Sequence, residues 1–522
     1  MLGRRTFLRT TTALALSCGM PAIVRAQGEG GDPEAVSVDF DQLTARAERL
    51  ASRPYAAPEP AEGLPEGLTY DLYRQIAFDP EAARWSDTGS DFRLHAFHLG
   101  WLFPSAVPLH EIQGGTAEEF DFTTEDFDYR HEAAEWMPDG TDLPGVAGFR
   151  IHYPLNRADV FDELLAFQGA SYFRALGRGN AYGLSSRGLA IDTASERPEE
   201  FPNFTEFYLV RPEPGDRRLT FFALLDSPSV AGAYRFVVTP GRETVMEVTA
   251  RLRFRADVAN LGIAPLTSMF LFSESNRADF DDYRMQVHDS EGLRIRRADG
   301  EVLWRALTNP PSLSKSIFSE PTARGFGLHQ RDRRFEDYQD AEARYQDRPS
   351  VEVEMIGEWE PGPVQLVEIP TDIEAHDNIV AYWQPDAGAK AGESKEFRYR
   401  LRWGMMPPEP DTRIAHVAET RTGQGGVAGV PYEGDARKFV VDFAGGVLAQ
   451  MDPDSDLTPR IALSSGELVE PVLYKIAGTG MWRLAFDIDP EPGELIELMA
   501  HIEGYGERLS ETWMFRFMPP TA

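Results

Sequence analysis

Short alternating and apolar segments dominate the chain from about residue 90 to residue 403. Examples are FRLHAFHLGWLF from Phe92, TEFYLVRP from Thr205, TVMEVTARLRFR from Thr244 and NIVAYW from Asn378. Gly, Pro, Asp and Asn separate these segments at the spacing expected of strands joined by turns. The pattern therefore predicts a large all-β region.

Helical periodicity is confined to two segments. In the first, Phe40, Leu43, Ala47 and Leu50 recur at helical spacing. This segment lies within residues 27–66, a polar stretch rich in Gly, Pro, Ala and Glu, so we expect it to precede the core without joining it. The second candidate helix is FDELLAFQGASYFRAL, which begins at Phe161.

A break in the pattern occurs at MMPPEP, residues 405–410, where three prolines end the strand character. The segments ARKFVVDFAG, LTPRIALSS, MWRLAFDID and SETWMFRFMP follow over about 110 residues, and this length and spacing suit an immunoglobulin-like sandwich. We therefore predict a large N-terminal β-sandwich over residues 27–404 and a smaller C-terminal one over residues 405–522.

The first 26 residues have the layout of an export signal, with a basic start, a weakly apolar middle and small residues at the end. Arg4 and Arg5, followed by two apolar residues, predict the twin-arginine route, whose machinery carries folded cargo. Cleavage after Ala26 would remove Cys18, the only cysteine. We therefore expect a mature chain without disulfides, thiolate ligands or a cysteine nucleophile.

Acidic residues outnumber basic ones by 32. Such a charge repels nucleic acid and anionic headgroups and leaves neutral ligands unaffected. Neutral sugars fit this picture best, although acidity that only keeps an exported protein soluble explains the charge equally well. After residue 30 the sequence has no run of 18 apolar residues, the length that a membrane-spanning helix requires.

The familiar nucleotide, zinc-protease and serine-hydrolase motifs GxxxxGK[ST], HExxH and GxSxG are absent from the sequence. We expect no cofactor and no metal, which leaves a cofactor-free reaction or simple binding. For a neutral glycan, that reaction is hydrolysis or transfer at the acetal. It needs one carboxylic acid to protonate the leaving oxygen and a second carboxylate to activate the attacking group.

Two aspartates stand where a strand pattern meets a turn. Asp289 continues the apolar row of Val287, and Asp377 continues the row of Ile379 and Trp383. An acid in that position is partly desolvated, and this raises its pKa toward that of a proton donor. A strand-end aspartate that accepts hydrogen bonds from turn amides is the commoner structural alternative.

Long motifs in the second half of the chain resemble one family. They are YRMQVHDSEGL, GEVLWRALTNP, GFGLHQRDRRFEDYQDAEARYQDRPS, GEWEPGPVQLVEIPT and HDNIVAYWQP, between residues 283 and 385. These stretches are similar to the periplasmic glucan biosynthesis family, called MdoG, OpgG and OpgD. The twin-arginine leader resembles the D type more than the G type.

The resemblance implies an N-terminal β-sandwich with a long cleft, an immunoglobulin-like second domain, and a periplasmic protein of osmoregulated glucan biosynthesis. It further implies an inverting, endo-type glycoside hydrolase that acts on β-1,2-glucan. By the family's motifs, Asp377 is the general acid and Asp289 the general base. Tyr345 and Glu374 then belong to the path through which protons and water are relayed.

Six further residues are expected near the glucan. Aromatic side chains are expected to lie against sugar rings, with packing in the core as the structural alternative: Trp304, Trp359, Tyr382 and Trp383. His288 and Arg331 are expected to hold sugar hydroxyls, or else to serve as structural hydrogen-bond partners.

Two alternatives to hydrolysis stay open. HDN stands at residues 376–378 where the family's NDN is expected, and motif retention does not decide whether water or a sugar hydroxyl attacks. A sugar hydroxyl would make the protein a transglycosylase. A non-catalytic, glucan-binding accessory protein of the membrane glucan synthase is the other alternative. The expected partners are thus β-1,2-glucan and that synthase, and nucleic acid is excluded.

Overall fold

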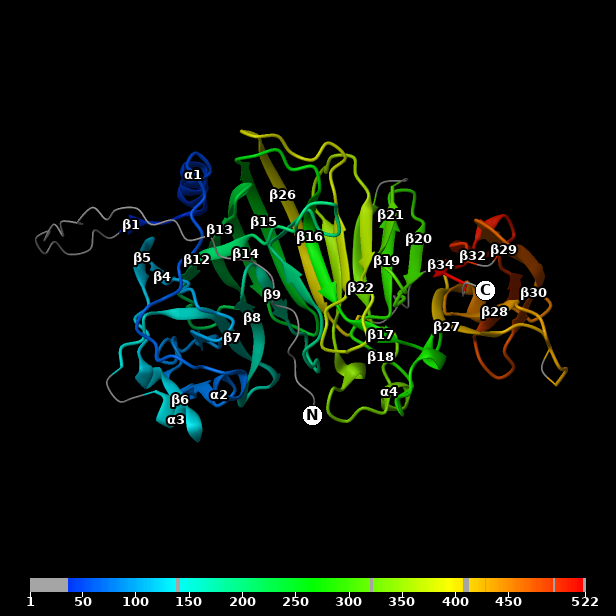
Figure 1. The fold of residues 1–522 in the computed structure, drawn as a ribbon, viewed down its shortest axis with the longest axis horizontal. Coiled ribbons are helices and arrows are strands. Elements are labelled where there is room, and N and C mark those ends of the chain that lie inside the picture. The colour runs from blue at the N-terminus through cyan, green and yellow to red at the C-terminus, as the bar shows by residue number, and fades with distance from the viewer. Residues whose placement is uncertain are drawn as a thin grey trace, which may run out of the picture. The chain divides into compact units, whose positions relative to one another are not determined.

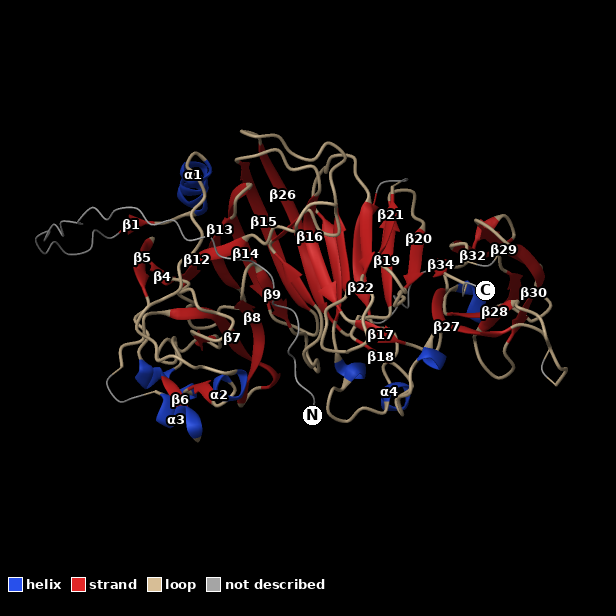
Figure 2. Cartoon of the chain, viewed as in Figure 1, coloured by secondary structure: helices blue, strands red, loops and turns tan. Residues whose placement is uncertain are grey.

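The computed structural model describes residues 36–137, 141–319, 323–406, 413–427, 429–491 and 493–519. The expected export signal, its twin arginines and Cys18 lie outside these residues. Strands far outnumber helices among the described residues (Figure 2), which confirms the predicted all-β class.

The larger of two facing sheets begins after the short strand β1 (Val36–Ser37). In spatial order, its strands in the first sandwich are β5 (Thr116–Glu119), β4 (Leu109–Gln113), β12 (Asn203–Val210), β13 (Leu219–Asp226), β14 (Val230–Thr239), β15 (Thr244–Phe254), β26 (Ser394–Gly404), β23 (Ser350–Met355), β22 (Ala323–His329), β19 (Gly292–Arg297) and β20 (Val302–Ala306). Along β15 every second side chain is buried, as a strand with one covered face requires.

The second sheet carries most of the residues that matter for the site. Its strands are, in spatial order, β21 (Ser314–Phe318), β24 (Val364–Glu368), β25 (Ile379–Trp383), β16 (Leu261–Ser268), β10 (Ser185–Arg187), β9 (Tyr172–Ala175), β8 (Val160–Gln168), β7 (Val146–Arg157) and β3 (Arg93–His98), with β11 (Leu189–Ile191) paired to β16. Two short antiparallel strand pairs stand apart from both sheets: β17 (Phe270–Phe272) with β18 (Val287–His288), and β2 (Ile76–Phe78) with β6 (Phe127–Tyr129). Figure 1 shows the long strands of the first sandwich at the centre of the view.

One large hydrophobic core fills the space between these sheets. Phe167 and Phe173 from the second sheet contact Phe236 from the first, with ring centroids 5.3 and 5.7 Å from that of Phe236. Aromatic pairs of this kind add stabilisation beyond the area that they bury. The two sheets therefore form a sandwich, as the sequence predicts.

Residues 161–176 are not helical, contrary to the prediction. They form β8 and β9, joined at Gly169 and Ala170, which both adopt positive φ angles (74° and 42°). The apolar residues of this segment match a helical period, but β8 pairs with β7 on one side and β9 on the other. Tertiary pairing thus overrides local periodicity.

The helix predicted near residue 40 is present as α1 (Phe40–Ala51), capped by Asp39, whose side chain accepts from the Gln42 N–H at 2.8 Å. The expectation that it stays out of the core is wrong. Leu43 and Ala47 are 2% and 0% exposed. They pack on the outer face of the larger sheet, in a small core of their own.

The remaining helices are short. They are α2 (Tyr70–Tyr73), α3 (Glu132–Trp136), α4 (Phe335–Tyr338) and the 3-10 turns Pro80–Ala82, Thr124–Asp126, Arg277–Asp279, Tyr345–Asp347 and Val447–Gln450. Among the described residues, no helix has the length and apolar character needed to cross a membrane.

Strands after residue 415 enclose a second hydrophobic core. One sheet contains β27 (His416–Gln424), β28 (Arg437–Ala444), β31 (Trp482–Asp489) and β30 (Glu467–Lys475), and the other contains β34 (Thr512–Phe517), β32 (Ile496–Gly504), β29 (Leu457–Leu463) and β33 (Glu507–Arg508). These strands appear in orange and red in Figure 1. The domain boundary at residue 405 stays a prediction, since residues 407–412 are not described.

The two sandwiches meet along a continuous seam. Strand β20 of the first pairs in parallel with β34 of the second, so the larger sheet runs from one sandwich into the other. Trp304 on β20 is 1% exposed and belongs to the second core. Arg331 stacks 3.4 Å from the centroid of the Trp304 ring and forms an ion pair of 2.9 Å with Glu511.

Candidate functional site

Asp377 lies at the end of a loop that Asn378 fixes to the second sheet. The buried Asn378 amide accepts from the Phe270 N–H at 2.8 Å and donates to the carbonyls of Phe270 and Ile369 at 2.9 and 3.0 Å. These bonds hold the chain where β25 begins. Asp377, one residue earlier, is exposed and does not continue the core row of Ile379.

Asp289 directly follows β18 and is 5% exposed. Its N–H donates to the Met269 carbonyl at 2.8 Å, and its carboxylate pairs with the Arg348 guanidinium. Arg348 also lies over the Tyr345 ring, 4.2 Å from the centroid. A buried carboxylate with such a partner keeps a fixed position.

The charges around the two aspartates belong to one site. Burial raises the pKa of Asp289 to about 6, the negative charge of Asp377 adds to this rise, and Arg348 and Arg174 oppose it. Desolvation also raises the pKa of Asp377, while Arg174, Arg187 and Arg348 lower it. Two arginines, Arg174 and Arg348, thus act on both carboxyls, and the charge of Asp377 acts on Asp289.

Tyr345 and Glu374 lie beside this pair. The Tyr345 hydroxyl donates to Glu374 at 3.3 Å. Burial, followed by the charge of Glu374, raises the pKa of Tyr345, so the phenol keeps its proton. Arg284 holds Glu374 at 2.7 Å and Asp340 at 2.9 Å, and thereby joins three loops around the site.

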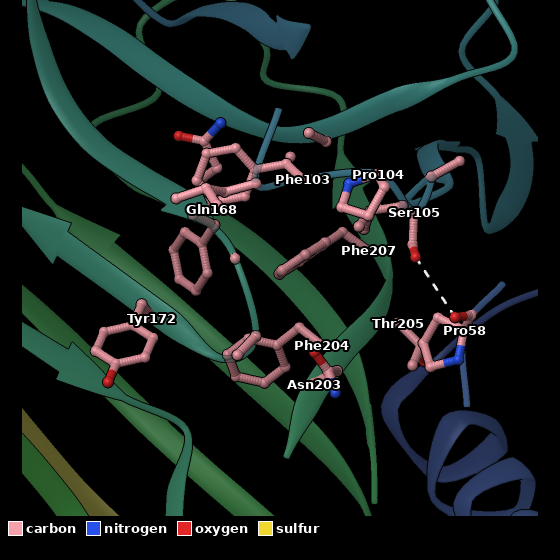
Figure 3. A pocket seen from close by; sticks show the side chains of 18 of the residues that line it. Pro58, Phe103, Pro104, Ser105, Gln168, Tyr172, Asn203, Phe204, Thr205 and Phe207 are labelled. Carbon is pink, nitrogen blue, oxygen red and sulfur yellow. Dashed lines mark hydrogen bonds between the residues drawn. The ribbon is translucent and has the colours of Figure 1, made fainter. Parts of the chain in front are cut away.

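A groove lies over strands β8 and β9 of the second sheet. Two cavities of about 360 and 300 Å³ meet at Phe103, Gln168 and Tyr172. Figure 3 shows the larger one, with Gln168 and Tyr172 at the left of the view, Pro104 and Ser105 at the right, and Phe204 and Phe207 between them. Burial raises the pKa of Tyr172, and the charge of Asp377 contributes to this rise.

The groove contains aromatic side chains that the sequence analysis did not select. Tyr182 is 41% exposed and lines the smaller cavity, where Arg174 lies 5.6 Å from its ring centroid. Phe97 lines the same cavity. Exposed rings and guanidinium groups of this kind suit the apolar faces and hydroxyls of a sugar.

The aromatic residues expected against the sugar pack into or against the hydrophobic cores instead. Trp304, Tyr382 and Trp383 are 1%, 1% and 0% exposed, and therefore offer no face to a ligand. Trp359 packs against the main core and donates its indole N–H to the Arg398 carbonyl at 3.2 Å. Strand periodicity shows that such residues alternate, but not which face the core covers.

His288 and Arg331 also have structural surroundings. His288 is 0% exposed, and its ring nitrogens contact Gln330 at 2.8 Å and Gln286 at 2.9 Å. Burial lowers its pKa to about 3, so the ring stays neutral. Arg331 is occupied by Glu511 at the seam. Both side chains thus make the contacts expected of structural hydrogen-bond partners.

Sequence reasoning missed four arginines of the site: Arg174, Arg187, Arg284 and Arg348. Arg348 stands in the motif ARYQDRPS, so its place beside Tyr345 offered a signal. Arg174 lies between Phe173 and Ala175 on β9, and a cation there must point away from the core. Arg187 forms an ion pair with Glu199 at 2.7 Å. Both arginines lower the pKa of Asp377, which is too distant in sequence for local spacing to connect it to them.

One group of described residues has the types that ligate metal ions. Glu274, Asp332 and Glu419 each place a carboxylate oxygen within 4.8 Å of the others. Burial and mutual repulsion raise the pKa of Glu274 to about 7 and that of Glu419 to about 8. Carboxyls with such pKa values share protons near neutral pH, and this lowers their mutual repulsion.

Comparisons with known proteins agree on one family. The model of the family "Periplasmic glucan biosynthesis protein, MdoG" matches residues 38–517. Three relatives carry the name "Glucans biosynthesis protein G". The protein of Cereibacter sphaeroides is 52% identical, and the match covers 99% of this chain and 98% of that protein. The protein of Shewanella frigidimarina is 44% identical, with 92% of this chain and 84% of that protein covered. The protein of Rhodopseudomonas palustris is 42% identical, with 99% of this chain and 100% of that protein covered.

Proposed function

Since the chain belongs to the periplasmic glucan biosynthesis protein family MdoG, we propose that it is an inverting, endo-acting glycoside hydrolase that cleaves β-1,2-glucan in the periplasm. The motifs that resemble this family supply the substrate. The groove and the carboxyl pair supply the chemistry. We further propose that the first 26 residues direct export by the twin-arginine route.

The observation that supports this proposal best is the shared electrostatic environment of Asp377 and Asp289. Asp377 is exposed, and its raised pKa suits a proton donor. Asp289 is covered by protein and held by Arg348. With a pKa of about 6, it is ionised at neutral pH and can accept a proton.

The proposed reaction begins with a glucan chain in the groove. Asp377 gives its proton to the glycosidic oxygen, directly or through a sugar hydroxyl, as the bond to the anomeric carbon breaks. A water molecule attacks that carbon from the opposite face, and its proton passes to Asp289. Because Asp289 is only 5% exposed, this transfer runs through water or through the Tyr345 hydroxyl and Glu374.

The burial of Asp289 also argues for inversion. A retaining enzyme needs its second carboxylate in direct contact with the anomeric carbon, as the nucleophile. Asp289 lies behind the surface and is bonded to Arg348. Water must therefore stand between this base and the sugar, which is the arrangement of an inverting glycosidase.

Transglycosylation is the second candidate. The relatives are named for glucan biosynthesis, and transfer to a sugar hydroxyl would use the same acid and base to build or remodel a chain. The third candidate is a binding role, in which the groove guides the polymer for the membrane glucan synthase without cleaving it.

Incubation of the purified protein with linear β-1,2-glucan, followed by product chromatography, distinguishes the three. Shortened chains support hydrolysis, lengthened or cyclic chains support transfer, and binding without change supports the accessory role. Asp377→Asn is expected to abolish turnover and leave binding intact. Asp372→Asn, on the same loop and equally exposed, is the matched control and should keep full activity. An active Asp377→Asn protein would refute the assignment of the acid.

A further inference from the structure

We propose that the seam between the two sandwiches contains a second carbohydrate site, a pocket that binds one neutral sugar unit of a glucan. The seam pocket has a volume of about 190 Å³. Its walls include Asn276, Asp279 and Ser312 from the first sandwich, and Arg437, Phe517 and Met518 from the second. The proposal rests on the proposed function only for its choice of ligand.

The pocket exists because both sandwiches contribute to it. Hydrogen bonds join its walls across the seam: the Thr422 hydroxyl donates to the Ser275 carbonyl at 2.5 Å, and Arg516 donates to the Ser314 hydroxyl at 2.5 Å. Two sandwiches joined in this way hold the pocket at a fixed width. Neither sandwich forms the site alone.

The lining matches the two kinds of surface that a sugar ring presents. Pro310, Pro311 and Phe517 supply apolar contacts for the C–H face of the ring. Hydroxyl and amide groups such as those of Asn276 and Ser312 supply hydrogen-bond partners for its rim. The volume is below the range of about 300–1,000 Å³ typical of larger ligands. A single ring is therefore the unit that fits.

Arg437 gives a further indication of a hydroxylated ligand. One guanidinium nitrogen donates to the Thr422 hydroxyl at 2.5 Å. Its Nε is buried, and no described residue accepts a hydrogen bond from it. Most buried donors in proteins have a partner, so an unmatched one calls for an explanation. Arg437 lines the pocket, so a sugar hydroxyl bound there would meet its guanidinium group.

The seam pocket is connected to the loop that bears the acid. Asn309, which lines the pocket, accepts from the Thr371 N–H at 3.0 Å and donates to the Thr371 carbonyl at 2.7 Å. The Thr371 hydroxyl lies 3.1 Å from the ring of His376, the neighbour of Asp377. A glucan unit in the pocket would therefore steady the acid loop, and the second sandwich would take part in substrate binding.

Methyl NMR of the full chain tests the proposal with the β-1,2-linked glucose disaccharide as probe. The chain carries Asp377→Asn and isotope-labelled methionine methyl groups. Met518 lines the seam pocket and is 40% exposed, so it reports this site. Met269, whose carbonyl accepts from Asp289, reports the proposed catalytic site. We expect the Met518 signal to shift and saturate as disaccharide is added.

Variants separate the two sites. Ser312→Trp places an indole at the pocket from an exposed loop position and should weaken the Met518 response at least tenfold while the Met269 response persists. Asp279→Ala should also weaken it. Asp281→Ala is the matched control, since Asp281 is an equally exposed aspartate two residues away that does not line the pocket.

The outcomes are distinct. A Met518 signal that does not move while Met269 responds overturns the seam site, and so does a Met518 response that Ser312→Trp and Asp279→Ala leave unchanged. A Met518 response that these variants remove, with Met269 silent, upholds the seam site and counts against the catalytic groove. Silence of both signals overturns both.

Discussion

The acidic trio of Glu274, Asp332 and Glu419 should make the stability of the protein depend on pH near neutrality. Glu419 comes from the second sandwich and the other two from the first. Burial and neighbouring carboxylates raise the pKa of Glu419 from 4.5 to about 8 in the folded chain. Between these values the folded state binds more protons than the unfolded state, so the free energy of unfolding falls as pH rises.

The magnitude follows from the linkage of protons to folding. A shift of one pKa unit corresponds to about 1.4 kcal/mol, which sets an upper bound of about 4–5 kcal/mol for Glu419 alone. Its side chain is 20% exposed and pairs with Arg421 at 2.9 Å, and its neighbours share protons with it. We therefore expect about 2 kcal/mol of lost stability between pH 6 and pH 9.

Urea unfolding at pH 6 and pH 9 provides the assay, with Glu419→Gln as the perturbation. Glutamine keeps the shape of the side chain and cannot ionise, so the variant should lose roughly half of the pH dependence and be about 1 kcal/mol more stable than the parent at pH 9. Glu433→Gln, at an exposed position of the same sandwich, should change neither. The reasoning fails if the parent protein is equally stable at both pH values, or if Glu419→Gln retains its full slope.

Two further predictions concern the catalytic pair and the N-terminal helix. Arg348→Met removes the cation that opposes the raised pKa of Asp289. The loss of a charged hydrogen bond, about 1.5–3 kcal/mol, should raise that pKa by about one to two units above 6. Less of Asp289 would then be ionised at pH 7, and kcat/KM at that pH should fall about two- to tenfold. Arg344→Met, which removes a half-exposed arginine of the same loop, should leave kcat/KM unchanged in the same glucan assay, and equal rates for both variants would exclude Arg348 from the site. Leu43→Ala should destabilise the protein by about 2–5 kcal/mol in chemical denaturation, because Leu43 is 2% exposed beneath α1. Leu102→Ala, at a 65% exposed position, should destabilise it much less. Similar losses of stability for the two variants would show that α1 adds nothing to the core.

The fold class could be predicted because strand alternation is a local property. Segments such as β15 repeat buried and exposed positions with period two, and the turns between them carry Gly, Pro and Asn. The segment from Phe161 could not be assigned in this way. Its apolar residues fit either period, and only the partners β7 and β9 decide for a strand. Likewise, the sequence within Phe40–Leu50 does not show that Leu43 packs against the larger sheet.

For the site, family motifs pointed to Asp377, Asp289, Tyr345 and Glu374. Of these, Asp289 and Tyr345 contact Arg348, and Tyr345 contacts Glu374. Their catalytic roles stay a proposal. The predictions for aromatic residues were less successful, because the residue type alone does not show whether a tryptophan in a strand lies in a core or against a sugar. Trp383 faces the main core, and Tyr182, which was not selected as a site residue, lines the groove.

The parallel pairing of β20 with β34 bears on how this architecture is inherited. A recombination event that exchanged the second sandwich for another module would strip β20 of its outer neighbour and leave the indole of Trp304 without its hydrophobic surroundings. The protein encoded by such a hybrid gene would expose an unpaired strand edge and would tend to aggregate. The two sandwiches are therefore expected to be inherited together, without replacement of one of them by another domain.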